Sequence, residues 1–244
     1  MTDVLTVLSL STPEFLRSVL EAKPRIAVFD CDGTLWSGDA GSTFMKWTIE
    51  TGLVSREISD AIDVRYRKYL RGEVSEVAIC GEMVQMYQGL RESELRRAAR
   101  VFFERLIEPN IFPEMQQLIG ELRALGTEVW AVSSTNEWVI EEGVSRFGIP
   151  AGRVLAARVR MHAGVATNEL TRVPTDERKV DALVEAGVSA PDVVFGNSVH
   201  DAAMLRIARR AYPVNPSPGL VTESSERGWA VYFPQSVRGP AKQG

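Results

Sequence analysis

The chain has 244 residues, of which 45% are hydrophobic and 25% are charged, and its formal net charge is -4. These values are ordinary for a folded globular protein, and they exclude a disordered chain, a collagen-like repeat and a coiled coil. Because Lys and Arg are not clustered, neither nucleic acid nor an anionic membrane is an expected partner, which leaves a small diffusing ligand. No stretch approaches the ~20 apolar residues of a membrane span, and the first residues lack a secretory pattern. We therefore expect a cytoplasmic monomer or homodimer.

The first predicted elements are a short amphipathic helix and a buried strand. Residues 13–22 carry Leu16, Val19 and Leu20 at helical spacing, after a Ser-Thr pair that can cap a helix. Residues 25–30 form a nearly continuous apolar run, which is typical of a strand buried on both faces. This strand places Asp30 at its carboxyl end.

The next segment has a different character. From about residue 42 to residue 108 the pattern is helical, with interruptions near Gly52, Gly72 and Gly89 and no convincing strand. We predict a helical cap domain over residues 41–108, inserted into a core domain formed by residues 1–40 and 109–244.

Beyond residue 109, helices and strands alternate. Such alternation implies parallel strands joined by right-handed crossovers. The predicted fold class is therefore α/β, with a doubly wound, Rossmann-like parallel sheet and the inserted helical cap. The predicted helices are 113–125, 138–147, 177–185 and 201–208, the predicted strands are 127–133, 192–196, 211–214 and 229–233, and a hairpin is predicted within 154–170.

Polar residues follow three of the predicted strands. Since ligands bind outside the carboxyl ends of the strands in such sheets, we expect these residues to meet in one crevice. Lys179, at the start of a helix, is placed to reach the same crevice. The residues that follow the strands are Asp30 and Asp32, then Ser133 and Ser134, then Asn197, His200 and Asp201.

The segment D-C-D-G-T-L begins at Asp30 and places two carboxylates two residues apart, before a glycine that allows a sharp turn. A hard cation such as Mg²⁺ suits these oxygens, and it would keep Asp30 ionised and offset the charge of an incoming phosphate. Asp30 is then the predicted nucleophile. Asp32 is the predicted acid that protonates the leaving alcohol and the base that later activates water.

Taken together, four motifs resemble the haloacid dehalogenase superfamily, and within it the phosphoserine phosphatase-like branch, which has a helical cap of the C1 type. The resemblance runs from about Ile26 to Phe233. The motifs are D-C-D-G-T at 30–34, an apolar strand ending at Ser133, a helix-start Lys179 and G-N-S-V-H-D at 196–201.

The resemblance implies a role for each matching residue. Ser133 would bond a phosphoryl oxygen, Lys179 would bridge Asp30 and the phosphate, and Asp201 would support the metal through its water shell. Backbone N–H groups around Gly33 and Ser134 would add phosphate contacts. The implied catalytic residues are Asp30, Asp32, Ser133 and Lys179, and the implied Mg²⁺ ligands are Asp30, Asp32, Asn197 and Asp201.

Two departures from the branch are visible. Asn197 stands where most relatives have an Asp metal ligand, so it offers an oxygen but no charge. Asp39 stands where phosphoserine phosphatases have a substrate-binding Glu, and their carboxylate-binding Arg has no equivalent near Met83. Asp39 with the aromatic residues Trp36 and Trp47 suits an amine or a quaternary ammonium on the substrate.

The sequence thus predicts an Mg²⁺-dependent phosphatase that hydrolyses a small phosphorylated metabolite through a phospho-aspartate on Asp30. Two alternatives remain open. A phosphoglucomutase-like transfer would use both aspartates and return the phosphate to a sugar. A catalytically weak phosphate-binding module of the same family would explain Asn197 as a mark of decay.

Overall fold

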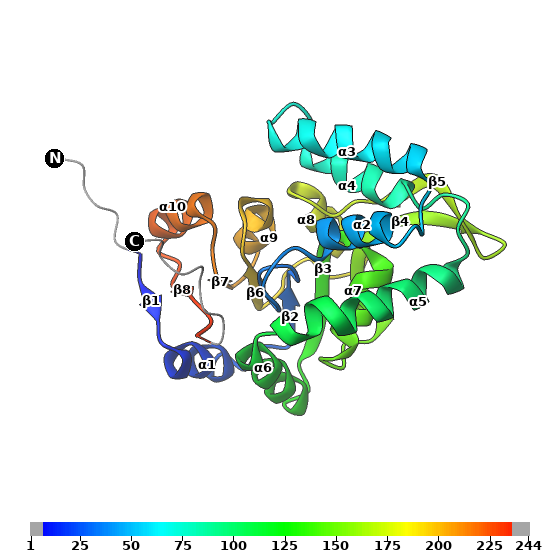
Figure 1. Ribbon diagram of the computed structural model, residues 1–244. Coiled ribbons are helices and arrows are strands. Elements are labelled where there is room, and N and C mark those ends of the chain that lie inside the picture. The colour runs from blue at the N-terminus through cyan, green and yellow to red at the C-terminus, as the bar shows by residue number, and fades with distance from the viewer. Residues whose placement is uncertain (1–6, 236–244) are drawn as a thin grey trace.

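A six-stranded sheet forms the centre of the computed structural model, which describes residues 7–235 (Figure 1). The strand order is β5-β4-β3-β2-β6-β7, and all neighbours are parallel except β4 and β5. The predicted α/β class and the doubly wound parallel sheet are therefore confirmed. The strands are β2 Ile26–Phe29, β3 Glu128–Asn136, β4 Val154–His162, β5 Val165–Arg172, β6 Val193–Gly196 and β7 Arg210–Pro213.

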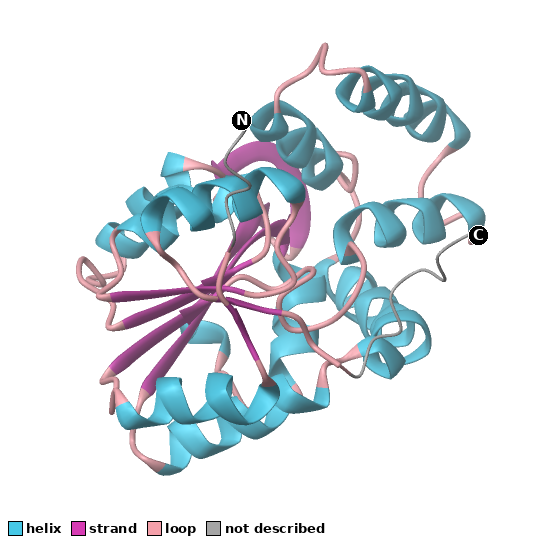
Figure 2. Cartoon of the chain, turned by 90° about the vertical axis from the view of Figure 1, so that its left-hand side faces the viewer, coloured by secondary structure: helices cyan, strands magenta, loops and turns pink. Residues whose placement is uncertain are grey.

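Helices cover both faces of this sheet (Figure 2). The alternation along β2 explains the two layers, because Val28 packs on one face while Ala27 and Phe29 pack on the other, and all three are fully buried. Helices α8, α9 and α10 cover the face of Val28, and α1, α6 and α7 contribute to the core on the other face. These helices are α1 Thr12–Glu21, α6 Pro113–Ala124, α7 Glu137–Ser145, α8 Glu177–Glu185, α9 Ala202–Arg206 and α10 Pro218–Arg227.

Four more helices lie between β2 and β3, in the predicted insert. The side chains of Asp39, Ser55 and Ser75 cap the first three of them by accepting a backbone N–H bond. Helix α4 packs against β3, β4 and β5, so the insert overlies one end of the sheet (Figure 1). The four helices are α2 Ala40–Glu50, α3 Arg56–Leu70, α4 Glu76–Gln85 and α5 Glu92–Phe102.

The division of the chain into a core domain and a cap domain stays a prediction. The first six residues of the predicted core, and its last residues from 236 to 244, lie outside the described part of the chain. Helix α2 begins at Ala40, one residue before the predicted start of the cap.

The last strand differs from the prediction. Residues 229–233 were expected to extend the main sheet, but β8 Val231–Tyr232 pairs with β1 Ser9–Leu10 in a separate two-stranded sheet. A single bridge connects β8 to the residue after β7. The Tyr232 ring stacks on the Phe15 ring of α1 with 4.1 Å between centroids, and this contact holds β8 beside the start of the chain.

The helices are short, and α3, with 15 residues, is the longest of those described. Within residues 7–235, none is long and apolar enough to cross a membrane. The cytoplasmic location and the oligomeric state stay predictions.

Candidate active site

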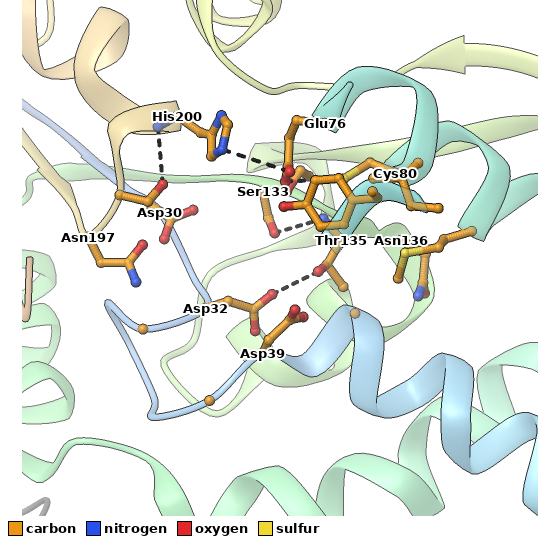
Figure 3. A pocket seen from close by; sticks show the side chains of 18 of the residues that line it. Asp30, Asp32, Asp39, Glu76, Cys80, Ser133, Thr135, Asn136, Asn197 and His200 are labelled. Atoms are coloured by element: carbon orange, nitrogen blue, oxygen red, sulfur yellow. Dashed lines mark hydrogen bonds and ion pairs between the residues drawn. The ribbon is translucent and has the colours of Figure 1, made fainter. Parts of the chain in front are cut away.

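A pocket of about 440 Å³ lies at the carboxyl ends of β2, β3 and β6 (Figure 3). All the predicted catalytic, phosphate-binding and metal-binding residues line it except Asp201, which lies behind Lys179. The core end of the pocket comprises Asp30, Asp32, Gly33, Ser133, Ser134, Thr135, Asn136, Lys179, Asn197, Ser198 and His200. The cap end comprises Tyr66, Tyr69, Glu76, Ile79, Cys80, Met83 and Val84.

The turn after β2 brings the two aspartates to the core end. The Asp30 N–H donates to the carbonyl of Phe195 in β6 at 2.9 Å, so strand pairing continues up to the aspartate. Gly33 then adopts a φ of 75°, a region that favours glycine. A Cβ at position 33 would lie 1.9 Å from the side-chain nitrogen of Asn197. The close approach of these two loops therefore requires glycine here.

Asp30 is buried at the core end, with 5% of its surface exposed. Its Oδ1 accepts a hydrogen bond from Lys179 Nζ at 2.8 Å, and its Oδ2 accepts one from the Thr34 hydroxyl at 3.0 Å. Burial and the nearby charge of Asp201 raise the pKa of Asp30 to about 6, against the lowering effect of Lys179. The carboxyl group is thus mainly ionised at neutral pH, and each oxygen keeps a free lone pair.

Lys179 and Asp201 form the layer behind Asp30. Lys179 Nζ donates to Asp201 Oδ1 at 2.5 Å, and both residues are almost completely buried. Burial opposes the charge on the lysine, but the carboxylates of Asp201 and Asp30 outweigh it and raise the pKa of Lys179. Asp201 Oδ2 accepts the backbone N–H groups of Asn197 and Ser198 at 2.8 and 2.9 Å. Asp201 therefore holds the loop that presents Asn197.

Asp32 is held separately from Asp30. Its Oδ1 accepts from the Trp36 indole N–H at 2.7 Å and from the Ala40 N–H at 2.8 Å, and its Oδ2 accepts from the Thr135 hydroxyl at 2.7 Å. Burial and the charge of Asp39 raise the pKa of Asp32 to about 7. A carboxyl group of this pKa can give and take a proton near neutral pH.

Ser133 and Ser134 line the pocket as predicted, but they lie within β3, which continues to Asn136 instead of ending at residue 133. Ser133 is 2% exposed, and its oxygen accepts the Thr135 N–H at 3.1 Å, so its own hydroxyl proton is free to donate. Asp39 lines the pocket but also caps α2, because its Oδ1 accepts the Ser42 N–H at 2.9 Å. The Asp39 side chain therefore has a structural role in addition to its predicted contact with the substrate.

The predicted contact of Trp36 and Trp47 with a cationic group of the substrate is wrong. Neither residue lines the pocket. Trp36 is fully buried against Phe103, with 5.2 Å between ring centroids, and its N–H is used by Asp32. Trp47 packs against Phe44 within the helical insert.

The structure adds functional residues that were missed in the sequence. Thr34 and Thr135 each donate a hydroxyl to one of the two aspartates. Thr34 lies four residues after Asp30, across the turn, and this spacing could have predicted its hydrogen bond to Asp30. Tyr66, Tyr69 and Glu76 line the cap end, and no pattern in the sequence distinguishes them from other helix residues.

The core end is suited to a hard cation. In the described residues, no group of three or more His, Cys, Asp and Glu side chains is arranged to hold a metal ion. Mg²⁺ needs less than this, because it keeps several waters and binds one or two carboxylates together with substrate phosphate. The buried carboxylates of Asp30 and Asp201 share a single ammonium group, that of Lys179, which leaves a net negative charge. Asp30 and Asn197 are available oxygen donors, and Asp32 Oδ2, which accepts one hydrogen bond, keeps a free lone pair.

Known proteins resemble this chain in sequence and in fold. A family model described as haloacid dehalogenase-like hydrolase matches residues 27–206. The chain belongs to this family. It is similar to the histidinol-phosphatase of Neisseria meningitidis serogroup C (strain 8013), with 27% identity over 217 residues that cover 84% of this chain and 97% of the relative.

Solved structures share the fold. A protein with unknown function from Bordetella pertussis Tohama I has a TM-score of 0.75 and 24% identity, covering 85% of this chain and 97% of that one. A phospho-aspartyl intermediate analogue of phosphoserine phosphatase has a TM-score of 0.58 and 16% identity, covering 86% and 93% of the two chains. The predicted family and an enzyme of the phosphatase type are confirmed, and the fold is shared with phosphoserine phosphatases. The residue roles, the metal and the substrate stay proposals.

Proposed function

We propose that the protein is an Mg²⁺-dependent phosphatase that hydrolyses a small phosphomonoester through a phospho-aspartate on Asp30. The observation that carries this proposal is the separation of two carboxyl groups with different surroundings. Asp30 contacts Lys179 and Thr34 in the buried core end, while Asp32 is held by three donors and has a pKa near neutrality. The first arrangement suits a nucleophile, and the second suits an acid and base.

In the first step an oxygen of Asp30 attacks phosphorus, the bond from phosphorus to the ester oxygen breaks, and Asp32 gives its proton to the leaving alcohol. In the second step Asp32 takes a proton from a water molecule that attacks the same phosphorus. The bond to Asp30 then breaks and inorganic phosphate leaves. Ser133 and Lys179 donate to phosphoryl oxygens throughout, which stabilises the charge of the transition state.

Mg²⁺, held by the side chains of Asp30 and Asn197, would neutralise the phosphate and orient it toward Asp30. Asp201 would act on the metal indirectly, because its carboxylate is bonded to Lys179 and to the Asn197 N–H. Asn197 carries no charge, so this site would bind Mg²⁺ less tightly than one with a third carboxylate.

Release of inorganic phosphate from a panel of small phosphomonoesters in Mg²⁺ tests the proposal, and histidinol phosphate belongs in the panel because of the relative's name. EDTA should abolish the release, and excess Mg²⁺ should restore it. Acid quenching during turnover, followed by mass spectrometry, should find one phosphoryl group on the peptide that contains Asp30. Turnover that survives EDTA, or phosphate transferred to a second sugar without release, would contradict the proposal.

A further inference from the structure

The cap end of the pocket contains a carboxylate oxygen that has no hydrogen-bond partner. Glu76 is the first residue of α4, and its side chain is 15% exposed. Its Oε1 accepts a weak hydrogen bond from Cys80 Sγ at 3.5 Å, but its Oε2 is buried and accepts no hydrogen bond. Leaving such an acceptor unsatisfied is unfavourable, and more so for a charged group. The position therefore requires an explanation.

The protein around Glu76 bonds the carboxylate elsewhere but donates no hydrogen bond to Oε2. His200 Nε2 is 3.8 Å from Oε2, which is too long for a hydrogen bond. The other ring nitrogen of His200 is engaged with Asp176 Oδ1 at 2.7 Å. Figure 3 marks the contact between the neighbouring side chains of His200 and Glu76, which is an ion pair only when the imidazole is protonated. A favourable interaction with the helix dipole explains an acidic residue at the start of α4, but it does not explain a buried oxygen beside a cavity.

The charge around this end of the pocket is negative. Glu76 and Asp39 are both pocket-lining carboxylates outside the core strands. Among the described residues that line the pocket there is no arginine, and the single lysine, Lys179, is bound to Asp30 and Asp201. An anionic group on the alcohol part of a substrate would meet repulsion here, and a cationic group would meet attraction.

Two tyrosines provide the remaining polar wall. The rings of Tyr66 and Tyr69 lie 5.9 Å apart between centroids and both line the pocket. Burial, together with a hydrogen bond and the charge of Glu76, raises the pKa of Tyr69 and keeps its hydroxyl protonated. Tyrosine faces attract cations, and the Lys46 ammonium already lies 5.8 Å from the centroid of Tyr66.

We infer that Glu76 recognises a protonated nitrogen on the alcohol part of the substrate, with Tyr66 and Tyr69 beside it. This inference rests on the proposed phosphatase function. The phosphate lies at the core end, against Ser133 and Lys179, and an N–H of the cationic group donates to Glu76 Oε2. The substrate class is a phosphomonoester of an amino alcohol or of another alcohol that carries a protonated nitrogen.

Matched esters test the inference in steady-state kinetics. The amino esters are 2-aminoethyl and 3-aminopropyl phosphate, their neutral counterparts of equal size are propyl and butyl phosphate, and phosphoglycolate is the anionic member. The wild type should favour at least one amino ester over its neutral counterpart by about tenfold or more in kcat/KM, because a charge-assisted hydrogen bond is worth at least that factor. Phosphoglycolate should be the poorest substrate.

Variants at Glu76 separate recognition from folding. Glu76→Gln should reduce kcat/KM for the preferred amino ester by about tenfold, mainly through KM, and change the neutral ester by less than about twofold. Glu76→Asp, which keeps the charge, should retain part of the preference. Glu73→Gln is the control, because Glu73 is exposed, bonds Arg71 and does not line the pocket, and it should change neither ester.

Failure of this inference can be distinguished from failure of the phosphatase proposal. Equal kcat/KM values for amino and neutral esters, or an equal loss for both in Glu76→Gln, would overturn this inference and leave the phosphatase proposal standing. No phosphate release from any ester in Mg²⁺ would overturn the phosphatase proposal and this inference with it.

Discussion

The two ends of the pocket are built in different ways. At the core end, Asp30, Asp32 and Lys179 are each held by two or three hydrogen bonds from strands and loops of the sheet. At the cap end, the wall is formed by tyrosines and apolar side chains of α3 and α4, and one carboxylate oxygen of Glu76 has no partner. In the function proposed above, the core end performs the reaction and the cap end selects the alcohol. Changes at the two ends should therefore affect different kinetic constants.

The largest loss of activity is expected for a substitution at Asp30. Asp30→Asn removes the nucleophilic oxygen but keeps the size of the side chain, so phosphate release should fall by at least about 10³-fold. Asp181→Asn is the control, because Asp181 is an exposed residue of α8. A phosphate-release assay on both variants, with circular dichroism to verify folding, makes the measurement. Activity of Asp30→Asn near the wild-type level would remove the core end from the mechanism.

Lys179→Met tests whether the core end is also important for stability. The change leaves Asp30 and Asp201 buried without their shared cation, which should lower the free energy of unfolding by about 3–5 kcal/mol. Denaturant unfolding in EDTA gives this value. Arg178→Met, at an exposed position on the same helix, should leave it almost unchanged. An equal stability for Lys179→Met and the wild type would contradict the buried ion pairs.

Asp32→Asn tests the pKa of the second carboxyl group. The pKa of Asp32 is about 7 in the folded protein and about 3.9 in an unfolded chain, so the folded protein binds the proton more tightly. Stability from this group is therefore present at low pH and is lost as the pH rises from about 4 to about 7. Metal-free Asp32→Asn, which does not ionise, should melt about 5 °C above the wild type at pH 8 and close to it at pH 4.

Asp192→Asn is the control, because its melting temperature at pH 8 should change in the opposite direction. Burial opposes its charge, but the N–H groups of Ile26 and Arg25 hold the pKa of Asp192 below its usual range. Its stabilising contribution is present above the unfolded pKa and is lost as the pH falls, so this variant should melt below the wild type at pH 8. If both variants shift in the same direction at pH 8, the assignment for Asp32 is wrong.

The smallest change in the kinetic constants is expected for a substitution at the cap end. Met83→Ala enlarges the pocket beside the alcohol without touching a hydrogen bond of the core end. KM should rise about threefold, and kcat should stay within about twofold, because the lost contact is made equally in the ground and transition states. Met161→Ala, a comparable truncation outside the pocket, should leave KM unchanged. A large fall in kcat for Met83→Ala would contradict the division between the two ends.

The sequence was most informative at the strand ends. Asp30, Ser133 and Asn197 each follow a short apolar run, and the rule for parallel sheets was sufficient to bring them together. Lys179 was found through the order of the motifs, and the structure places its ammonium 2.8 Å from Asp30. These placements succeed because the residues are fixed by the pairing of neighbouring strands, which is strongly encoded in local sequence.

The cap end could not be predicted in the same way. Tyr66, Tyr69 and Glu76 enter the pocket because α4 docks over the hairpin of β4 and β5 and α3 packs against α4. Helical periodicity does not specify where a helix docks. Trp36 illustrates the opposite error, because it was predicted to contact the substrate but does not line the pocket. Its place near the motif suggested a substrate contact, but the turn directs its ring into the core and its N–H to Asp32.

The pairing of β8 with β1 also affects the outer margin of the main sheet. After β7, the chain makes a bridge and a hydrogen bond with Tyr232, in which the Asn215 N–H donates to the Tyr232 carbonyl at 2.7 Å. Backbone groups that would otherwise be available to a strand of another molecule are thus partly occupied by the chain itself. Loss of the segment that carries β8 would therefore free the Asn215 N–H and the backbone of Val214, in addition to any loss of stability.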